Sequence, residues 1–203
     1  MSKPPLKIGI TGGIGSGKSH VAGVLRRWGI PVYDTDREAK RLMQESADIR
    51  RGLTALLGPG AYGADGKPDK ARVAAYLFGS PEHARRINGL VHPAVQDDFL
   101  RWAAGQDAPL VAMECAILYE SGFDRLVDEV LLVVAPEDVC LERAMKRDGA
   151  TESQVKARMA AQMPDAERRA RARYVVDNGS GTDVEPALKE LLARMARERQ
   201  PRD

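Results

Sequence analysis

The sequence lacks the features that mark several large protein classes. Among its 203 residues there are only two cysteines, Cys115 and Cys140, and they lie too far apart for a metal or redox pair, so we expect reduced thiols in the core. The longest apolar run, residues 130–135, is much shorter than the roughly 20 residues of a membrane-spanning helix. The first residues also lack the basic and apolar pattern of a secretion signal. We therefore expect a cytoplasmic protein without a membrane partner.

Strong charge of one sign and internal repetition are missing too. The 31 basic and 29 acidic residues leave a net charge of +2, whereas nucleic-acid binders present a strongly basic field, so we expect no nucleic-acid partner. No segment recurs at a period of roughly 20 to 50 residues, which excludes a repeat architecture. The length fits one globular domain with an insertion or two.

The most informative motif is Gly-Gly-Ile-Gly-Ser-Gly-Lys-Ser at residues 12–19, directly after the apolar run at residues 6–11. The order of strand, glycine-rich loop and helix is that of a P-loop, in which backbone N–H groups surround a polyphosphate. We expect positive φ at Gly12, Gly13, Gly15 and Gly17, because that conformation turns the amides inward. The expected ATP contacts at the motif are Gly13, Ile14, Gly15, Ser16, Gly17, Lys18, Ser19 and His20.

Two side chains of the motif have specific roles in this interpretation. Lys18 reaches the β and γ oxygens of the nucleotide, and the hydroxyl of Ser19 is a ligand for Mg²⁺. The helix that begins there also directs the positive end of its dipole at the phosphates. The motif therefore predicts ATP as a ligand and Mg²⁺ as its cofactor.

Nearly continuous apolar runs predict a parallel sheet that is covered on both faces, with strands at residues 6–11, 30–33, 110–114, 129–135 and 174–176. We expect an α/β fold with a three-layer α/β/α P-loop kinase core at residues 1–36, 105–147 and 173–203. Residues 37–104 are rich in helical patterns and are interpreted as a helical insertion that binds the acceptor. Residues 148–172 are strongly charged with an excess of arginine, which favours a mobile lid.

A P-loop alone leaves open a switch GTPase, a motor ATPase, a transporter subunit and a small-molecule kinase. The chain has no Asn-Lys-x-Asp motif for guanine and little room for domains that couple hydrolysis to mechanical work. A kinase needs a second substrate site and a means of excluding water from the phosphoryl group. The insertion and the lid are candidates for these two parts.

Further short motifs follow the P-loop in a fixed order, and together they resemble the dephospho-CoA kinase family over nearly the whole chain. The resemblance implies transfer of the γ-phosphate of ATP to the ribose 3′-hydroxyl of dephospho-CoA, a core like that of nucleoside monophosphate kinases, a helical domain for the CoA-type substrate and a closing lid. The motifs are residues 11–19, Asp34-Thr35-Asp36, His92-Pro93, Leu118-Tyr119-Glu120, Arg147-Asp148 with Thr151, Gln162, and Val176-Asp177-Asn178-Gly179.

By position in the family pattern, Asp36 meets the acceptor hydroxyl and either takes its proton or orients it. The simpler alternative for Asp36 is the N-cap of a helix. Asp34 is the weaker candidate, with capping and the outer coordination shell of Mg²⁺ both open. The resemblance also implies that Arg147 reaches the phosphates when the lid closes. Arg143 either stacks on adenine or lies in solvent.

The remaining candidates have equally simple alternatives. His92 either contacts the acceptor or packs in front of Pro93 at the start of a helix. Asn178 either lies near adenine or belongs to an ordinary Asn-Gly turn. Leu118 and Glu120 are candidates for substrate contact through the family motif. The catalytic set is Lys18, Asp36 and Arg147.

The chain departs from the family pattern at four positions. Glu114 and Ala116 stand where members usually have Asp and Pro, so we expect Glu114 to join Ser19 at Mg²⁺ through a water. His20 replaces the usual Thr and should matter little, whereas the effect of Arg173 in place of the usual Asp is not predicted. Two alternatives stay open, namely a kinase for another small alcohol or nucleotide and a non-catalytic nucleotide-binding protein. We expect a monomer or a weak homo-oligomer.

Overall fold

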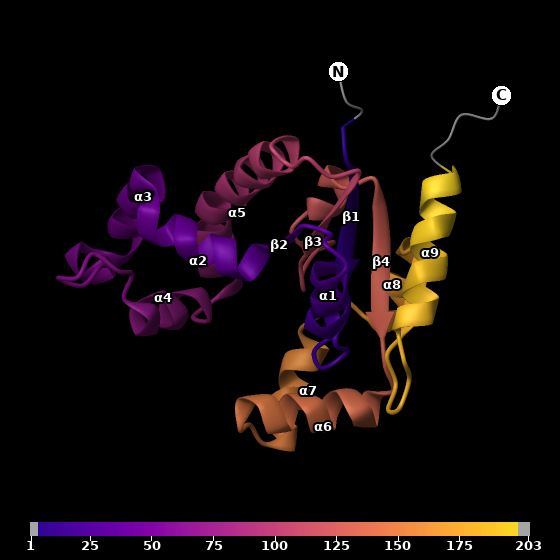
Figure 1. The fold of residues 1–203 in the computed structure, drawn as a ribbon. Coiled ribbons are helices and arrows are strands. Elements are labelled where there is room, and N and C mark those ends of the chain that lie inside the picture. Colours follow the sequence, from indigo (N-terminus) through magenta and orange to yellow (C-terminus); the bar gives the residue numbers. More distant parts are fainter. Residues whose placement is uncertain (1–3, 199–203) are drawn as a thin grey trace. The chain divides into compact units, whose positions relative to one another are not determined.

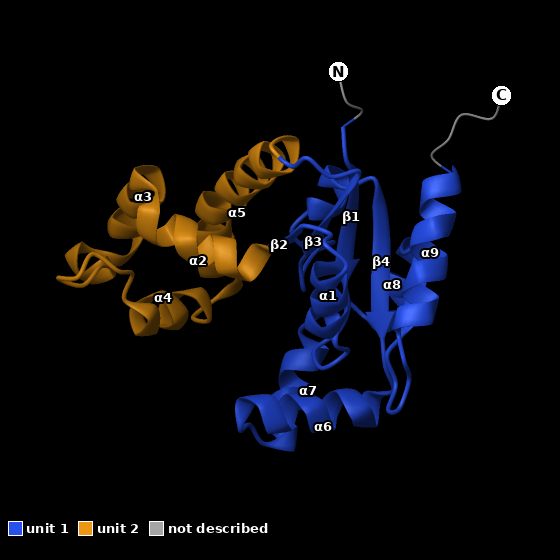
Figure 2. Ribbon diagram, viewed as in Figure 1, with its two compact units in different colours: residues 1–33, 106–203 blue, residues 34–105 orange. Residues whose placement is uncertain are grey.

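The computed structural model describes residues 4–198, and the chain divides into two compact units (Figure 2). The core unit comprises residues 1–33 and 106–203, and the helical unit comprises residues 34–105. Within residues 4–198, no helix combines the length and the apolar character that crossing a bilayer requires.

A parallel sheet forms the centre of the core unit. Its strands lie in the spatial order β2-β3-β1-β4-β5, and β1 pairs in parallel with both β3 and β4, as β4 does with β5. The bounds are β1 Leu6–Thr11, β2 Val32–Asp34, β3 Leu110–Glu114, β4 Glu129–Val134 and β5 Tyr174–Asp177. Each lies within two residues of its predicted position, which confirms the parallel α/β sheet.

Helices cover both faces of this sheet (Figure 1). On one face, alternate strand residues such as Ile8 and Ile10 pack with the apolar stripes of α1, Lys18–Arg27, and α9, Glu185–Glu198. On the other face, the segment around η2, Phe123–Leu126, buries Leu118 and Phe123. The helices α6, Glu137–Asp148, α7, Glu152–Ala160, and α8, Asp165–Arg171, follow β4 in the chain.

Arg173 links the last strand to its neighbours. Its Nη1 lies 2.9 Å from Oε1 of Glu129 on β4, and its Nη2 lies 2.7 Å from Oε2 of Glu198 on α9. The hydroxyl of Tyr174 donates to the same Glu198 carboxylate, and burial together with this bond raises the pKa of Tyr174 to about 12. The arginine at this position therefore serves a surface ion-pair network.

The helical unit consists of α2 Thr35–Glu45, α3 Ala47–Leu57, η1 Pro59–Ala61, α4 Lys70–Leu77 and α5 Pro81–Ala104. Each of its α-helices begins after a residue whose side chain accepts hydrogen bonds from the first turn, namely Asp34, Ser46, Asp69 and Ser80. These caps fix where the helices start. The buried residues of α5 recur every four positions, at Ile87, Val91, Val95, Phe99 and Ala103.

The alternative in which His92 packs in front of Pro93 at the start of a helix is wrong. Helix α5 begins at Pro81 and continues through Pro93 to Ala104. Proline removes one hydrogen bond from a helix interior, but the buried stripe on both sides of Pro93 keeps this helix continuous. His92 therefore lies in the middle of the helix, where burial lowers the pKa of its imidazole.

Candidate functional site

The P-loop joins β1 to α1. Gly12, Gly15 and Gly17 have positive φ as expected, and α1 begins immediately after Gly17. Gly13 does not have positive φ, so that expectation is wrong. The glycine at this position instead leaves room for Arg168, because a Cβ there would lie 3.1 Å from Nη2 of Arg168.

Gly15 is required for both conformation and packing, which yields a test. Its φ is +78°, and a Cβ would lie 2.0 Å from the carbonyl oxygen of Cys140. Gly29 is a matched control, because its φ is +77° but a Cβ would meet nothing within 4 Å. We expect Gly29→Ala to lower the free energy of unfolding by about 1 kcal/mol, and Gly15→Ala to lower it several times more. If denaturant titrations gave equal losses of unfolding free energy for the two variants, the close approach of Gly15 to Cys140 would not contribute to the requirement for glycine.

The cation and the hydroxyl of the motif are both engaged. The Nζ of Lys18 donates to the carbonyl oxygens of Gly12, at 2.9 Å, and Gly13, at 3.0 Å. The hydroxyl of Ser19 donates to Oε1 of Glu114 at 2.6 Å. Sequence analysis paired Ser19 with Glu114 at a Mg²⁺ site, and the fold brings the two residues together.

The oxygen atoms of Ser19 and Glu114 fit Mg²⁺, which prefers hydroxyl, carboxylate and water oxygens. Glu114 ends β3 with 9% of its surface exposed, and Nη2 of Arg26 lies 3.6 Å from its second carboxylate oxygen. No cluster of three or more His, Cys, Asp or Glu side chains that could hold a metal occurs in residues 4–198. A cation at Ser19 would therefore also need oxygen ligands from a nucleotide or from water.

A cavity of about 370 Å³ brings together Gly17, His20, Arg143 and Asn178, which were all expected to contact ATP. Asn178 is buried and donates from Nδ2 to the carbonyl oxygen of Ser16 at 2.8 Å, so it ties the P-loop to the end of β5. Nη1 of Arg143 donates to the carbonyl oxygen of Asn178 at 2.8 Å. Arg143 is thus a partly buried wall of this cavity and does not lie in solvent.

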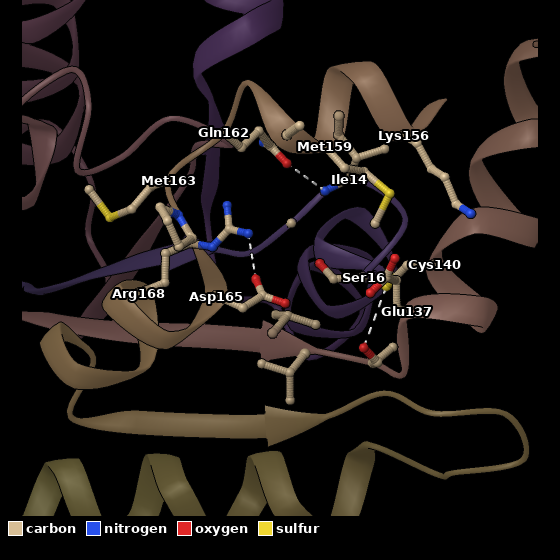
Figure 3. A pocket seen from close by; sticks show the side chains of 16 residues that line it. Ile14, Ser16, Glu137, Cys140, Lys156, Met159, Gln162, Met163, Asp165 and Arg168 are labelled. Atoms are coloured by element: carbon tan, nitrogen blue, oxygen red, sulfur yellow. Dashed lines mark hydrogen bonds and ion pairs between the residues drawn. The ribbon is translucent and has the colours of Figure 1, made fainter. Parts of the chain in front are cut away.

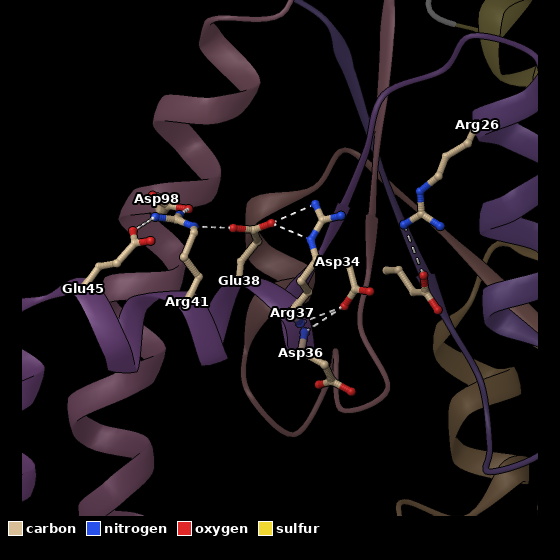
Figure 4. Close-up of polar contacts among 9 residues, drawn as sticks. Arg26, Asp34, Asp36, Arg37, Glu38, Arg41, Glu45 and Asp98 are labelled. Atoms are coloured by element: carbon tan, nitrogen blue, oxygen red, sulfur yellow. Dashed lines mark hydrogen bonds and ion pairs between the residues drawn. The ribbon is translucent and has the colours of Figure 1, made fainter. Parts of the chain in front are cut away.

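In the helical unit, Asp34 and Asp36 differ in what their side chains do (Figure 4). Oδ1 of Asp34 accepts hydrogen bonds from the backbone N–H groups of Asp36, at 3.1 Å, and Arg37, at 3.0 Å, so Asp34 is the N-cap of α2. The capping alternative for Asp36 is therefore wrong. The exposed carboxylate of Asp36 has no hydrogen bond or ion pair with another described residue, and it is available to a ligand.

Arg147 is exposed at the end of α6 and pairs with its neighbour. Its Nε and Nη2 donate to the two carboxylate oxygens of Asp148 at 2.7 and 3.0 Å, and Arg158 donates to the same carboxylate at 2.9 Å. The hydrogen bond from Arg147 is the main cause that lowers the pKa of Asp148 to about 2. A contact between Arg147 and phosphate stays a prediction.

Leu118 and Glu120 have structural partners. The side chain of Leu118 is fully buried, and a Cβ on Gly9 would lie 2.9 Å from it, so the expected substrate contact through this side chain is wrong. The family motif at this point encodes a core residue. Glu120 is exposed and accepts a hydrogen bond from the backbone N–H of Met163 at 3.1 Å.

The structure adds residues that sequence reasoning did not assign to the site (Figure 3). The N–H of Ile14, which was expected to bind phosphate, donates instead to Oε1 of Gln162 at 2.9 Å. Arg168 on α8 is almost fully buried beside Gly13 and pairs with Asp165. Gln162 was visible only as part of a family motif, and Arg168 was one of many arginines between residues 148 and 173.

A family model described as dephospho-CoA kinase matches residues 6–183 of the chain. The chain belongs to the dephospho-CoA kinase family. A dephospho-CoA kinase from Bacteroides fragilis is 42% identical over 189 residues, which cover 93% of this chain and 92% of that protein.

Solved structures agree with the membership in the dephospho-CoA kinase family. A crystal structure of a Thermus thermophilus protein has a TM-score of 0.83 at 40% identity and covers 95% of this chain and 99% of its own. A dephospho-CoA kinase from Campylobacter jejuni has a TM-score of 0.70 at 19% identity, with 96% and 98% covered, which shows the fold alone. The predicted P-loop kinase and its three-layer α/β fold are confirmed.

Proposed function

We propose that this chain transfers the γ-phosphate of ATP to the ribose 3′-hydroxyl of dephospho-CoA, giving CoA and ADP. The observation that carries the proposal is the joint presence of an intact P-loop and the bond of 2.6 Å between Ser19 and Glu114 in a member of this family. The P-loop leads into the start of α1, which supplies backbone N–H groups and a positive dipole end for the phosphates. The proposed adenine site is the cavity between Gly17, Arg143 and Asn178.

Asp36 is the proposed group at the acceptor hydroxyl. Its carboxylate is exposed and not used for capping, so it is able to accept a hydrogen bond from an alcohol. Phosphoryl transfer through a loose transition state needs little alkoxide character, so Asp36 acts either as a base or by orienting the hydroxyl. In this proposal the helical unit holds the CoA-type substrate, with His92 and Glu120 as further contacts. Residues 148–172 close as a lid, and Arg147, which directly precedes them, then reaches the phosphates.

Ser19 and Glu114 are the residues proposed to hold Mg²⁺, Ser19 through its hydroxyl and Glu114 through a water. When bound, the cation neutralises charge on the β and γ oxygens. The hydrogen bond from Ser19 orients the Glu114 carboxylate before any nucleotide arrives. Arg26 limits the negative charge that Glu114 would otherwise place near the phosphates.

Replacing Glu114 should affect the requirement for Mg²⁺ more than the affinity for ATP. We expect Glu114→Ala to raise the Mg²⁺ concentration for half-maximal activity by about 10- to 100-fold, as for other supporting ligands. Glu114→Asp, which restores the residue usual in the family, should stay near the wild type. Activity titrated against Mg²⁺ at saturating ATP measures both. A Mg²⁺ dependence that Glu114→Ala leaves unchanged would remove Glu114 from the site.

The proposal is tested with purified protein, ATP, Mg²⁺ and a panel of acceptors that includes dephospho-CoA, nucleoside monophosphates and shikimate. We expect CoA and ADP to form together, in equal amounts, and only with dephospho-CoA. Phosphorylation of a nucleoside monophosphate without that of dephospho-CoA would identify another small kinase. Binding of ATP without turnover of any acceptor would favour the non-catalytic alternative. We further propose a cytoplasmic enzyme that is a monomer or a weak homo-oligomer, which sedimentation measures.

A further inference from the structure

A second cavity, of about 440 Å³, lies beside the P-loop on the side of α7 and α8 (Figure 3). Its walls include Gly13 and Ser16 of the loop, the end of β4, and Gln162, Asp165 and Arg168. All of these residues belong to the core unit. The roles derived above do not explain the buried guanidinium of Arg168, which lines this cavity.

Arg168 is the most unusual of these groups, because a buried cation needs partners for its N–H donors. Only 5% of its surface is exposed, yet Nε and Nη1 are buried without a hydrogen-bond partner among the described residues. Its ion pair with Asp165 uses Nη2, and the Asp165 side chain is 68% exposed, so solvent weakens that attraction. Leaving charged donors unpaired in a protein interior is costly, which indicates that a ligand completes the site.

Ser16 independently indicates the same missing partner. Its side-chain oxygen is buried, lacks a hydrogen-bond partner in the described part of the chain, and lines the same cavity. A guanidinium and a hydroxyl are both donors. The group that would satisfy both is an anion rich in acceptor oxygens, for which phosphate is the matching chemistry.

The position of Arg168 beside the P-loop indicates which phosphate group it would contact. Its Nη2 lies 3.1 Å from where a Cβ of Gly13 would be, and the carbonyl oxygen of Gly13 accepts from Nζ of Lys18 at 3.0 Å. The two cations therefore flank the same residue of the P-loop. We propose that Arg168 is a catalytic residue whose guanidinium contacts the terminal phosphate of bound ATP. This inference rests on the proposed function only in taking ATP as the ligand.

Arg168 stabilises charge in the reaction and transfers no proton. The bond between the γ-phosphorus and the bridging oxygen of ADP breaks, and a bond from the acceptor oxygen to that phosphorus forms. The electron pair of the broken bond remains on ADP, and the acceptor proton leaves toward Asp36 or water. A planar guanidinium is suited to the charge that spreads over the equatorial oxygens.

The chain holds Arg168 in place before ATP binds. Gln162 bonds to the N–H of Ile14, and the N–H of Met163 bonds to Glu120. Arg171 lies over the ring of Tyr119, 4.3 Å from its centroid. The segment of residues 162–171, which is the C-terminal part of the proposed lid, is thus already attached to the P-loop and to the turn that follows β3. This preorganisation distinguishes Arg168 from the exposed Arg147.

The test compares the binding of ATP and ADP to the full chain by calorimetry, without an acceptor. Arg168→Met is the test variant, and Arg169→Met is its control, because Arg169 is the exposed neighbour on α8. We expect Arg168→Met to weaken ATP binding by about 10- to 100-fold, with ADP binding changed much less, because only the terminal phosphate loses a charged contact. Turnover should fall by about 10²- to 10³-fold. Arg169→Met should change neither quantity.

Each alternative outcome has a defined meaning. Equal weakening of ATP and ADP would show that Arg168 only shapes the P-loop, which overturns the inference. If Arg168→Met kept the same ratio of ATP to ADP affinity as the wild type, the inference would also be overturned, while the proposed function would stand. A wild type that binds no ATP would refute both. If Arg168→Met does not fold, Arg168→Lys decides, since a point charge without the planar fork should lose part of the ATP preference, and an unchanged preference refutes the contact.

Discussion

Replacing Asp36 by alanine should lower turnover by about 10²- to 10⁴-fold while leaving ATP affinity and stability close to the wild type. Replacing Asp34 by alanine should instead lower stability and leave turnover close to the wild type. The carboxylate of Asp34 caps α2, so Asp34→Ala should lower the free energy of unfolding by about 1 kcal/mol. Asp36 does not cap, so its removal costs the helix little. Steady-state kinetics, ATP titration and denaturant unfolding of both variants measure this crossed pattern.

The two variants are matched controls for each other, because they lie two residues apart at the same helix start. Unchanged turnover in Asp36→Ala would remove Asp36 from the mechanism. A loss of turnover in Asp34→Ala that equals that of Asp36→Ala would show that helix position, and not the Asp36 carboxylate, is limiting. Asp36→Asn then separates the two roles, since an amide still orients a hydroxyl but is a poor base. If Asp36 orients the hydroxyl, Asp36→Asn should retain substantial activity with an unaltered pH profile. If Asp36 is a base, Asp36→Asn should lose most of its activity, and the pH profile should change.

The sheet and the P-loop could be predicted because their signals are local. Continuous apolar runs are typical of parallel strands buried on both faces, and each of the five strands lies within two residues of its predicted position. The glycine spacing gave the strand, loop and helix order and, in Gly15 and Gly17, residues with positive φ. The pairing of Ser19 with Glu114 was available only through the family pattern, because the two residues are 95 positions apart.

The remaining features depend on tertiary contacts that the sequence does not display. Pro93 is usually a signal for a helix start, but the buried stripe of α5 continues across it. Gly13 was assigned a positive φ because it lies in a glycine-rich loop, whereas the structure shows instead that it leaves little space for a side chain beside Arg168. Leu118 lies in a functional motif and yet packs under Gly9.

Arg168 shows that the charge pattern of the sequence also does not reveal which charged side chain is buried. Composition identified residues 148–172 as basic and predicted a mobile lid. The pattern could not indicate that Arg168 alone is buried with two unpaired donors while Arg147 and Arg169 are exposed. A count of charges predicts a basic lid in this segment, but burial determines which arginine is fixed beside the P-loop before ATP binds.

The second large effect is expected at Lys18. Its ammonium bonds to the carbonyl oxygens of Gly12 and Gly13, so the positive charge is held at the loop that the phosphates enter. Lys18→Ala removes the only charged side chain within the motif at residues 12–19, and the backbone amides that remain carry no net charge to balance the nucleotide. We expect turnover to fall by about 10³-fold or more and ATP affinity to fall with it.

Thermal or denaturant unfolding with and without ATP measures the loss independently of chemistry. At an ATP concentration of 100 times the Kd of the wild type, the wild type should gain about 2.7 kcal/mol of stability. Lys18→Ala should gain much less at the same ATP concentration. Lys189→Ala is the control, because Lys189 lies on α9 over the ring of Trp28 and should leave the gain intact. If Lys18→Ala were stabilised by ATP as strongly as the wild type, the P-loop could not be the phosphate site, and the contacts proposed for Ser19 and Arg168 would fall with it.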